Sequence, residues 1–178
     1  MKNLTKLLTI TVLSFIVIGA NAAVPAYVKQ IQTYVHANKA EEQKLSLLFV
    51  QQAKMVNAKS AAKTDCYNVT LSGLNDNLIF FSDRPQHVVG NLTTAEFEQL
   101  WQDNKEAPNA VLHGTDAQGK KVNIVLTLSL PTYNSKQNTM TYPACITDSA
   151  SEKTAVPSSL TNITLFIDPL NHFMFGKA

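Results

Sequence analysis

Apolar residues recur along this chain with two different periods, and each period predicts a different kind of element. Over residues 26–40 they recur at three- and four-residue spacing, which is typical of an amphipathic helix. The apolar positions of that helix are Tyr27, Val28, Ile31, Tyr34 and Val35. Further along, apolar and polar residues alternate over short stretches, which indicates strands with one buried face.

The stretches with the length and composition of strands are residues 66–71, 78–81, 110–112, 122–130, 139–146 and 160–167. Turn residues between them predict two hairpins, one from the first two stretches and one from the third and fourth. Pro143 cannot donate a ladder hydrogen bond, so we expect its strand at a sheet edge. The last stretch alternates only approximately.

One helix carries its start signal in its own side chains. Thr93 and Glu96, three residues apart, form a capping box, in which each side chain bonds the other residue's backbone N–H. Leu92 is placed to pack against Phe97 across the first turn. We therefore expect a helix from Thr93 to about Asp103, with its apolar side on the core.

The first 22 residues have the pattern of a secretory signal peptide. Lys2 and Lys6 precede an apolar run, and Ala20-Asn21-Ala22 fits the cleavage rule. A run of about 12 apolar residues is shorter than the ~20 of a membrane-spanning helix, which argues against the alternative of a retained anchor. We expect residues 23–178 to form a single secreted domain, periplasmic or extracellular, with no transmembrane segment.

Cleavage would also change the charge. It removes Lys2 and Lys6 and no acid, which leaves thirteen basic and thirteen acidic residues, with Arg84 the single arginine. A neutral chain lacks the basic face that nucleic-acid binding requires. The chain also has no P-loop, glycine-rich dinucleotide turn, nucleophile elbow or zinc-binding helix motif, so we expect no cofactor.

Cys66 and Cys145 are the only cysteines. An exported chain meets an oxidising environment, so we expect a disulfide between them. It would close a loop of about 80 residues, worth up to roughly 4 kcal/mol in the chain-entropy model. Two thiols without C-x-x-C spacing are too few for a zinc or redox site.

The turn from Asp83 to His87 is the candidate ligand site. Arg84 could bind a carboxylate or phosphate, and Asp83 with His87 could support acid–base chemistry. We favour the alternative that the turn is structural, because Pro85 restricts the backbone and Asp83 can bond its own turn. For a metal site, His87 and His113 would have to meet Asp83 or Asp116 in the fold, and we expect none.

The motifs FFSDRPQHVVGNLTTAEFEQLW and PNAVLHG, taken in order, resemble a family of small secreted bacterial proteins of unknown function. The family pattern is FSDRP-x-R-x-x-G, then F-x-x-x-W, then PNA-x-L, and the similarity runs from about Leu48 to Asp168. It implies secretion and a shared architecture but no activity. It also favours a strand over a helix for residues 47–56. His87 replaces the second family arginine, which would weaken a two-arginine anion clamp.

Together these patterns predict a single α+β domain with one disulfide. A mainly antiparallel β-sheet would be packed by one or two helices, at residues 93–103 and 26–40. For function we expect a non-enzymatic module that binds a protein, glycan or lipid partner through the N-terminal helix or the apolar tail with Phe173 and Phe175. The alternative is a hydrolase-like or small anionic ligand site at Asp83, Arg84 and His87.

Overall fold

The computed structural model describes residues 46–82, 87–104, 107–147 and 155–169. The helix predicted at residues 26–40 and the tail with Phe173 and Phe175 lie outside them. The elements are β1 (Leu48–Ser60), β2 (Cys66–Leu74), β3 (Asn77–Ser82), β4 (Val88–Thr93), α2 (Thr94–Asn104), β5 (Asn109–Thr115), β6 (Lys121–Leu128), β7 (Thr132–Asn134), β8 (Thr139–Ile146) and β9 (Ser159–Ile167).

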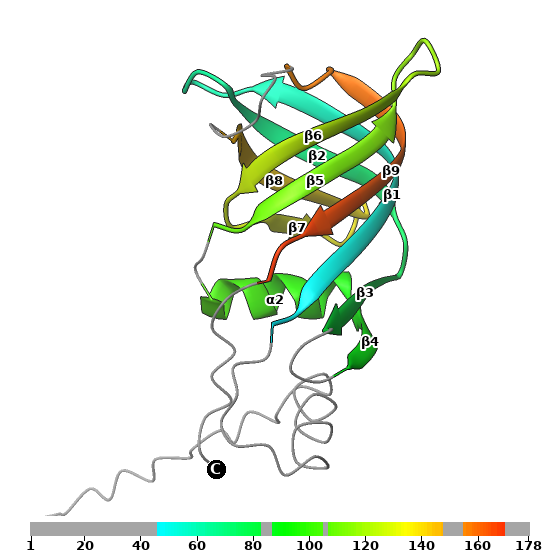
Figure 1. The fold of residues 1–178 in the computed structure, drawn as a ribbon, viewed down its shortest axis with the longest axis vertical. Coiled ribbons are helices and arrows are strands. Elements are labelled where there is room, and N and C mark those ends of the chain that lie inside the picture. Colours follow the sequence, from blue (N-terminus) through cyan, green and yellow to red (C-terminus); the bar gives the residue numbers. More distant parts are fainter. Residues whose placement is uncertain (1–45, 83–86, 105–106, 148–154, 170–178) are drawn as a thin grey trace, which may run out of the picture.

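Six strands close into an antiparallel barrel (Figure 1). They follow the order β1-β2-β8-β6-β5-β9, and β9 pairs again with β1. The β3–β4 hairpin extends from β1 outside this ring, and β7 pairs with β8. The predicted α+β class is therefore wrong. A ring of strands buries its inner face against itself, so it needs no helices to cover a sheet.

At one height along the barrel axis, β1 passes between two residues with positive φ. Lys54 of β1 lies between Gly73 of β2 and Asn162 of β9, whose φ angles are 64° and 52°. The β1–β2 and β1–β9 ladders keep their register past this level, whereas the β5–β9 ladder shifts by one residue, which marks a bulge in β9. A bulge bends its strand and increases its twist. This irregularity in β9 explains why its buried residues Leu160 and Ile163 are three positions apart, where regular alternation would place them two apart.

Helix α2 covers one end of the barrel (Figure 1). The capping box is confirmed: the Thr93 N–H donates to Glu96 Oε2 at 2.9 Å, and the Glu96 N–H donates to Thr93 Oγ1 at 3.2 Å. Leu92 and Phe97 are both buried in the core. The helix thus begins after Thr93, as predicted.

One of the two predicted hairpins is present in the structure and the other is not. The β5–β6 hairpin is confirmed. A hairpin of residues 66–71 with 78–81 is wrong, because β2 and β3 do not pair with each other. Both lie against the long strand β1, β2 along residues 53–60 and β3 along residues 48–50. The strand prediction for residues 47–56 is confirmed, and β1 continues to Ser60.

Strand β8 lies inside the ring, so the edge position predicted from Pro143 is wrong. On one side of β8, residues 144–146 pair with β6 and residues 139–141 pair with β7. Pro143 falls between these two ladders, where its carbonyl accepts a hydrogen bond from the Ser129 N–H at 2.8 Å. The missing N–H of Pro143 therefore removes no ladder hydrogen bond.

The predicted disulfide is confirmed. Cys66 and Cys145 lie directly opposite each other in the β2–β8 ladder, with their Cα atoms 4.0 Å apart. Both lie on the outward side of their strands, because Tyr67, Ala144 and Ile146 next to them pack towards the core, although Cys66 is itself only 7% exposed. The bond therefore ties an early strand to a late one on the outer surface of the barrel.

Candidate functional site

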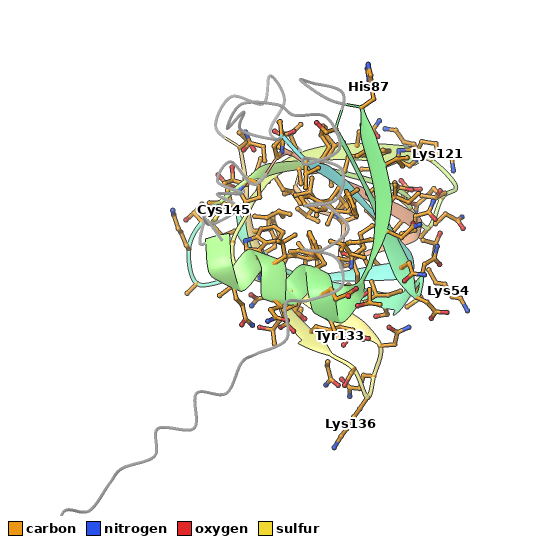
Figure 2. The ribbon with its side chains drawn as sticks, turned by 90° about the horizontal axis from the view of Figure 1, so that it is seen from below. Lys54, His87, Lys121, Tyr133, Lys136 and Cys145 are labelled. Carbon is orange, nitrogen blue, oxygen red and sulfur yellow. A yellow bond between two sulfur atoms is a disulfide. The ribbon has the colours of Figure 1, made fainter. Side chains whose placement is uncertain are left out.

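The structure describes one of the three residues predicted to bind a ligand. Asp83 and Arg84 lie outside the described residues. His87 immediately precedes β4, and its exposed side chain points away from the core (Figure 2). The hypothesis of a site at this turn therefore stays a prediction.

The two other residues considered as metal ligands hold the β5–β6 hairpin. His113 Nδ1 shares a 2.7 Å hydrogen bond with Asn123 Oδ1 on the neighbouring strand. Asp116 Oδ1 accepts hydrogen bonds from the backbone N–H groups of Gln118 and Lys120, each at 2.9 Å. Across the described ranges, no three His, Cys, Asp or Glu side chains are grouped as a metal site.

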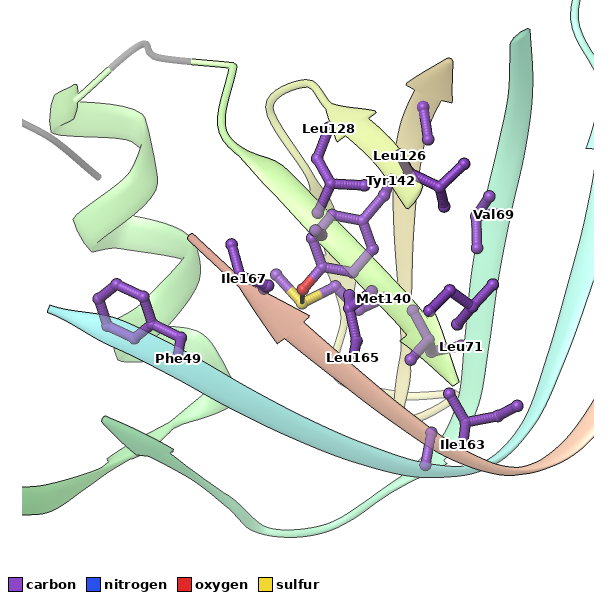
Figure 3. Packing of buried hydrophobic residues seen from close by; sticks show 14 of the residues in the cluster. Phe49, Val69, Leu71, Leu126, Leu128, Met140, Tyr142, Ile163, Leu165 and Ile167 are labelled. Atoms are coloured by element: carbon purple, nitrogen blue, oxygen red, sulfur yellow. Dashed lines mark hydrogen bonds between the residues drawn. The ribbon is translucent and has the colours of Figure 1, made fainter. Parts of the chain in front are cut away.

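Sequence reasoning missed a polar pair inside the barrel. Tyr142 is fully buried and donates its hydroxyl hydrogen to Gln51 Oε1 at 2.5 Å, while Gln51 Nε2 donates to Met140 Sδ at 3.3 Å. Figure 3 shows Tyr142 and Met140 side by side among aliphatic residues. Burial raises the pKa of Tyr142 well above its ordinary value, so the hydroxyl stays protonated. The pair is neutral and hydrogen-bonded, which is a structural arrangement rather than a reactive one.

Aromatic rings connect this pair to the covered end of the barrel. The ring centroids of Tyr142 and Trp101 are 5.8 Å apart, those of Trp101 and Phe97 5.5 Å, and those of Phe97 and Phe49 5.0 Å. Phe97 and Trp101 belong to α2, so the helix closes this end by placing its rings in the core. Among the described residues no charged side chain is buried. The interior formed by the described residues is therefore a packed core.

The outer surface carries a row of apolar side chains across five neighbouring strands. In the order β3-β1-β9-β5-β6, the ladders place these residues opposite one another: Ile79, Val50, Phe166, Val111 and Val125. We call this row the outer stripe. Its residues point outwards because their chain neighbours are buried. Ile79 is 46% exposed, Phe166 48% and Val125 40%.

Phe81 and Val89 add to the outer stripe at its β3–β4 end. They face each other in the β3–β4 ladder and are 36% and 65% exposed. On the other side of the stripe, the next outward row consists of Gln52, Thr164, His113 and Asn123. Neither row contains Lys, Arg, Asp or Glu. This surface can therefore bind through apolar burial. On the other flank of the stripe, the outward row that includes Phe81 and Leu48 carries one charged residue, the exposed Asp168, whose N–H donates to the Asn109 carbonyl at 2.9 Å.

Alternation alone could have marked each stripe residue as an outward apolar position. What it could not show is that five strands align these positions, since the alignment depends on ladders between distant segments. Phe166 did carry a sequence signal for this surface, because it is an apolar residue at a position of its strand where alternation predicts a polar one.

The fold and its surface define a small disulfide-linked β-barrel with a helix over one end and an apolar outer stripe. No protein-family model matches the chain, and neither a curated protein nor a solved structure does. The resemblance to small secreted bacterial proteins therefore stays a prediction.

The disulfide and the helix of the structure bear on where the protein is located. The disulfide between Cys66 and Cys145 fits a compartment outside the cytoplasm, where thiols become oxidised. Within the part of the chain that the structure describes, no helix has the length and apolar character to cross a membrane.

Proposed function

We propose that this protein is an exported, non-enzymatic binding module that uses the outer stripe to bind a protein partner. The alignment of outward-facing apolar side chains across five strands, three of them exposed, is the observation that supports this proposal. Aligned apolar patches on a polar surface are characteristic of interaction sites. A sheet also holds such side chains rigidly, so little side-chain ordering is required on binding.

The chemistry of the stripe favours a protein over an anionic lipid surface. Anionic lipid surfaces attract clustered Lys and Arg, and the stripe and its polar neighbours contain neither. Four of the five stripe residues are aliphatic, Ile79 and the three valines, and Phe166 lies at the centre of the row. An uncharged apolar centre with a polar border is the usual composition of a protein interface.

The cellular setting of this function is export. We propose that residues 1–22 are removed and that residues 23–178 fold outside the cytoplasm, in the periplasm or beyond the cell. The cross-strand disulfide supports this setting. The partner would then be another exported or surface protein.

Photo-cross-linking in the exporting cell tests the proposal. A photoreactive amino acid is placed at Phe166 in one variant and at Met55 in another. The two side chains are 48% and 47% exposed, and Met55 lies outside the stripe. We expect a discrete cross-linked protein from position 166 that is absent from position 55. Equal patterns at both positions, or no product from position 166, would contradict the proposal.

Binding measured with the purified partner makes the test quantitative. We expect Phe166→Asp to weaken binding at least tenfold, about 1.4 kcal/mol, because a carboxylate would be buried in an apolar contact. Met55→Asp should leave affinity unchanged. Both variants should keep the thermal stability of the wild type, since both side chains point outwards.

A further inference from the structure

We propose that β4 joins two copies of this chain edge to edge, as an antiparallel pair of strands related by a two-fold axis. Among the described strands, β4 pairs with β3 alone, and it stands at the end of the order in which the strands are bonded (Figure 1). An edge strand presents a row of N–H and C=O groups that forms a template for pairing with another strand. This pairing does not depend on whether the outer stripe binds a different protein.

The capping box shows which backbone groups of β4 point away from β3. The Thr93 N–H donates to Glu96 Oε2 at 2.9 Å, so it is directed away from β3. In an antiparallel ladder, residues two positions apart direct their N–H and C=O groups to the same side. The backbone groups of Val89 and Asn91 therefore lie on the outer edge of β4, while the alternate residues of β4 bond to β3.

These two residues are complementary to their own copy. When Gly90 of both copies lies at the two-fold axis, Val89 of each copy lies opposite Asn91 of the other. Each such pair exchanges two N–H···O=C hydrogen bonds, and the axis generates the pair twice. All the edge groups of Val89 and Asn91 are then bonded. This self-complementarity is the reason for assigning a second copy as the occupant of the edge.

Strand β4 lacks the features that usually keep sheet edges apart, which are charged residues, Pro and bulges. Its residues, VVGNLT, include no charge and no Pro, and all six pair with β3 without a register shift. The short edge strand β7 differs. It has three residues, and its Tyr133 N–H donates to Glu98 Oε1 of α2 at 2.8 Å, so a helix side chain occupies that edge.

Apolar side chains also meet at the proposed axis. Val89 is 65% exposed and lies opposite Phe81, itself 36% exposed, on the outward face of the β3–β4 hairpin. In the dimer the two copies of Val89 are diagonal neighbours across the new ladder, a position from which side chains in a sheet interact. Neither β3 nor β4 contains a charged residue, so the axis places no like charges opposite each other.

Sedimentation velocity of the purified exported protein at increasing concentration tests the proposal, and we expect a monomer–dimer equilibrium in the wild type. Val89→Lys brings two like charges together at the axis and should raise the dissociation constant of the dimer at least roughly tenfold. Asn91→Pro removes an edge N–H and should have the same effect. Met55→Lys is the matched control, because Met55 is 47% exposed on β1, away from the edge, and it should leave the equilibrium unchanged.

A wild type that stays monomeric at every concentration overturns the proposal. A dimer that persists in Val89→Lys and Asn91→Pro also overturns it, and loss of that dimer in Phe166→Asp would place the contact on the outer stripe instead. Thermal unfolding of each variant identifies one that does not fold, and the other variant then decides the test. None of these outcomes bears on binding of a different protein, which is measured by cross-linking from position 166 in the cell.

Discussion

At the scale of single residues, Gln51 is the least expected feature of the core. It occupies a position where alternation along β1 predicts an apolar residue, between Phe49 and Ala53. Its partner Tyr142 is 91 positions away in the sequence, so no local pattern could pair the two. A buried amide is tolerated here because both its oxygen and its nitrogen have hydrogen-bond partners.

Removing the Tyr142 hydroxyl should destabilise the protein. Tyr142→Phe leaves the Gln51 oxygen buried without its donor, which should lower the free energy of unfolding by about 1–3 kcal/mol. In the double variant Gln51→Leu with Tyr142→Phe, both polar groups are absent, so much of that loss should be recovered. Urea denaturation of the wild type, both single variants and the double variant measures the coupling. Strictly additive losses would show that the pair is not coupled.

Gly90 could be recognised as part of a sequence motif, but the structural requirement for glycine at this position could not. It is the glycine of the FSDRP-x-R-x-x-G pattern, and the ring of Phe80 lies over it. A Cβ atom at this position would lie 2.4 Å from Phe80 Cζ. Only the β3–β4 ladder, which sets Phe80 opposite Gly90, reveals this close approach.

At the scale of elements, local signals predicted local structure. Helix α2 and the β5–β6 hairpin depend on residues within a few positions of each other, such as Thr93 with Glu96, and both were confirmed. The hairpin expected between residues 66–71 and 78–81 was wrong because both strands pair with β1 and not with each other. Strand β1 is long enough to pair with β2 and β3 in succession. The residues of the turn between β2 and β3 do not indicate this shared partner.

The capping box should contribute measurably to stability. Thr93→Ala removes the side-chain acceptor of the Glu96 N–H, and we expect a loss of about 0.5–2 kcal/mol in the free energy of unfolding. Thr93→Ser keeps the hydroxyl and should retain most of the wild-type stability. Chemical denaturation monitored by Trp101 fluorescence compares the three proteins. Equal losses in both variants would assign the effect to the lost methyl group instead.

At the scale of the whole molecule, the alternation of apolar and polar residues predicted the strands but did not predict that they close into a barrel. An open sheet and a barrel have the same pattern of inward and outward residues. What separates them is that β1 pairs with both β2 and β9, together with the bulge in β9 near Asn162. The sequence showed only that residues 160–167 alternate approximately, and that pattern does not identify the partners of the strand, so the ring was missed. The outer stripe was missed with it, since its alignment exists only in the closed ladders.

The disulfide should stabilise the closed ring as a whole. Replacing both cysteines, Cys66→Ala with Cys145→Ala, should lower the free energy of unfolding by about 2–4 kcal/mol, because the unfolded chain gains freedom. Thr70 and Thr141 provide a matched control on the same β2–β8 ladder, where their hydroxyl oxygens lie 2.9 Å apart. Replacing both by alanine should cost no more than about 1 kcal/mol. Denaturation without reductant measures both.

A disulfide contribution no larger than that of the threonine pair would contradict this account. Alkylation of the exported wild-type protein, followed by mass spectrometry, checks that the bond is formed: no label should be incorporated before reduction.

The pairing of β1 with β9 also governs when the protein can fold. The first described strand is held between its neighbour β2 and the last strand of the barrel, so the ring cannot close until residue 167 is available. Such distant contacts form slowly. A chain passing N-terminus first through a translocation channel would therefore be unable to close the ring until β9 has emerged from the channel.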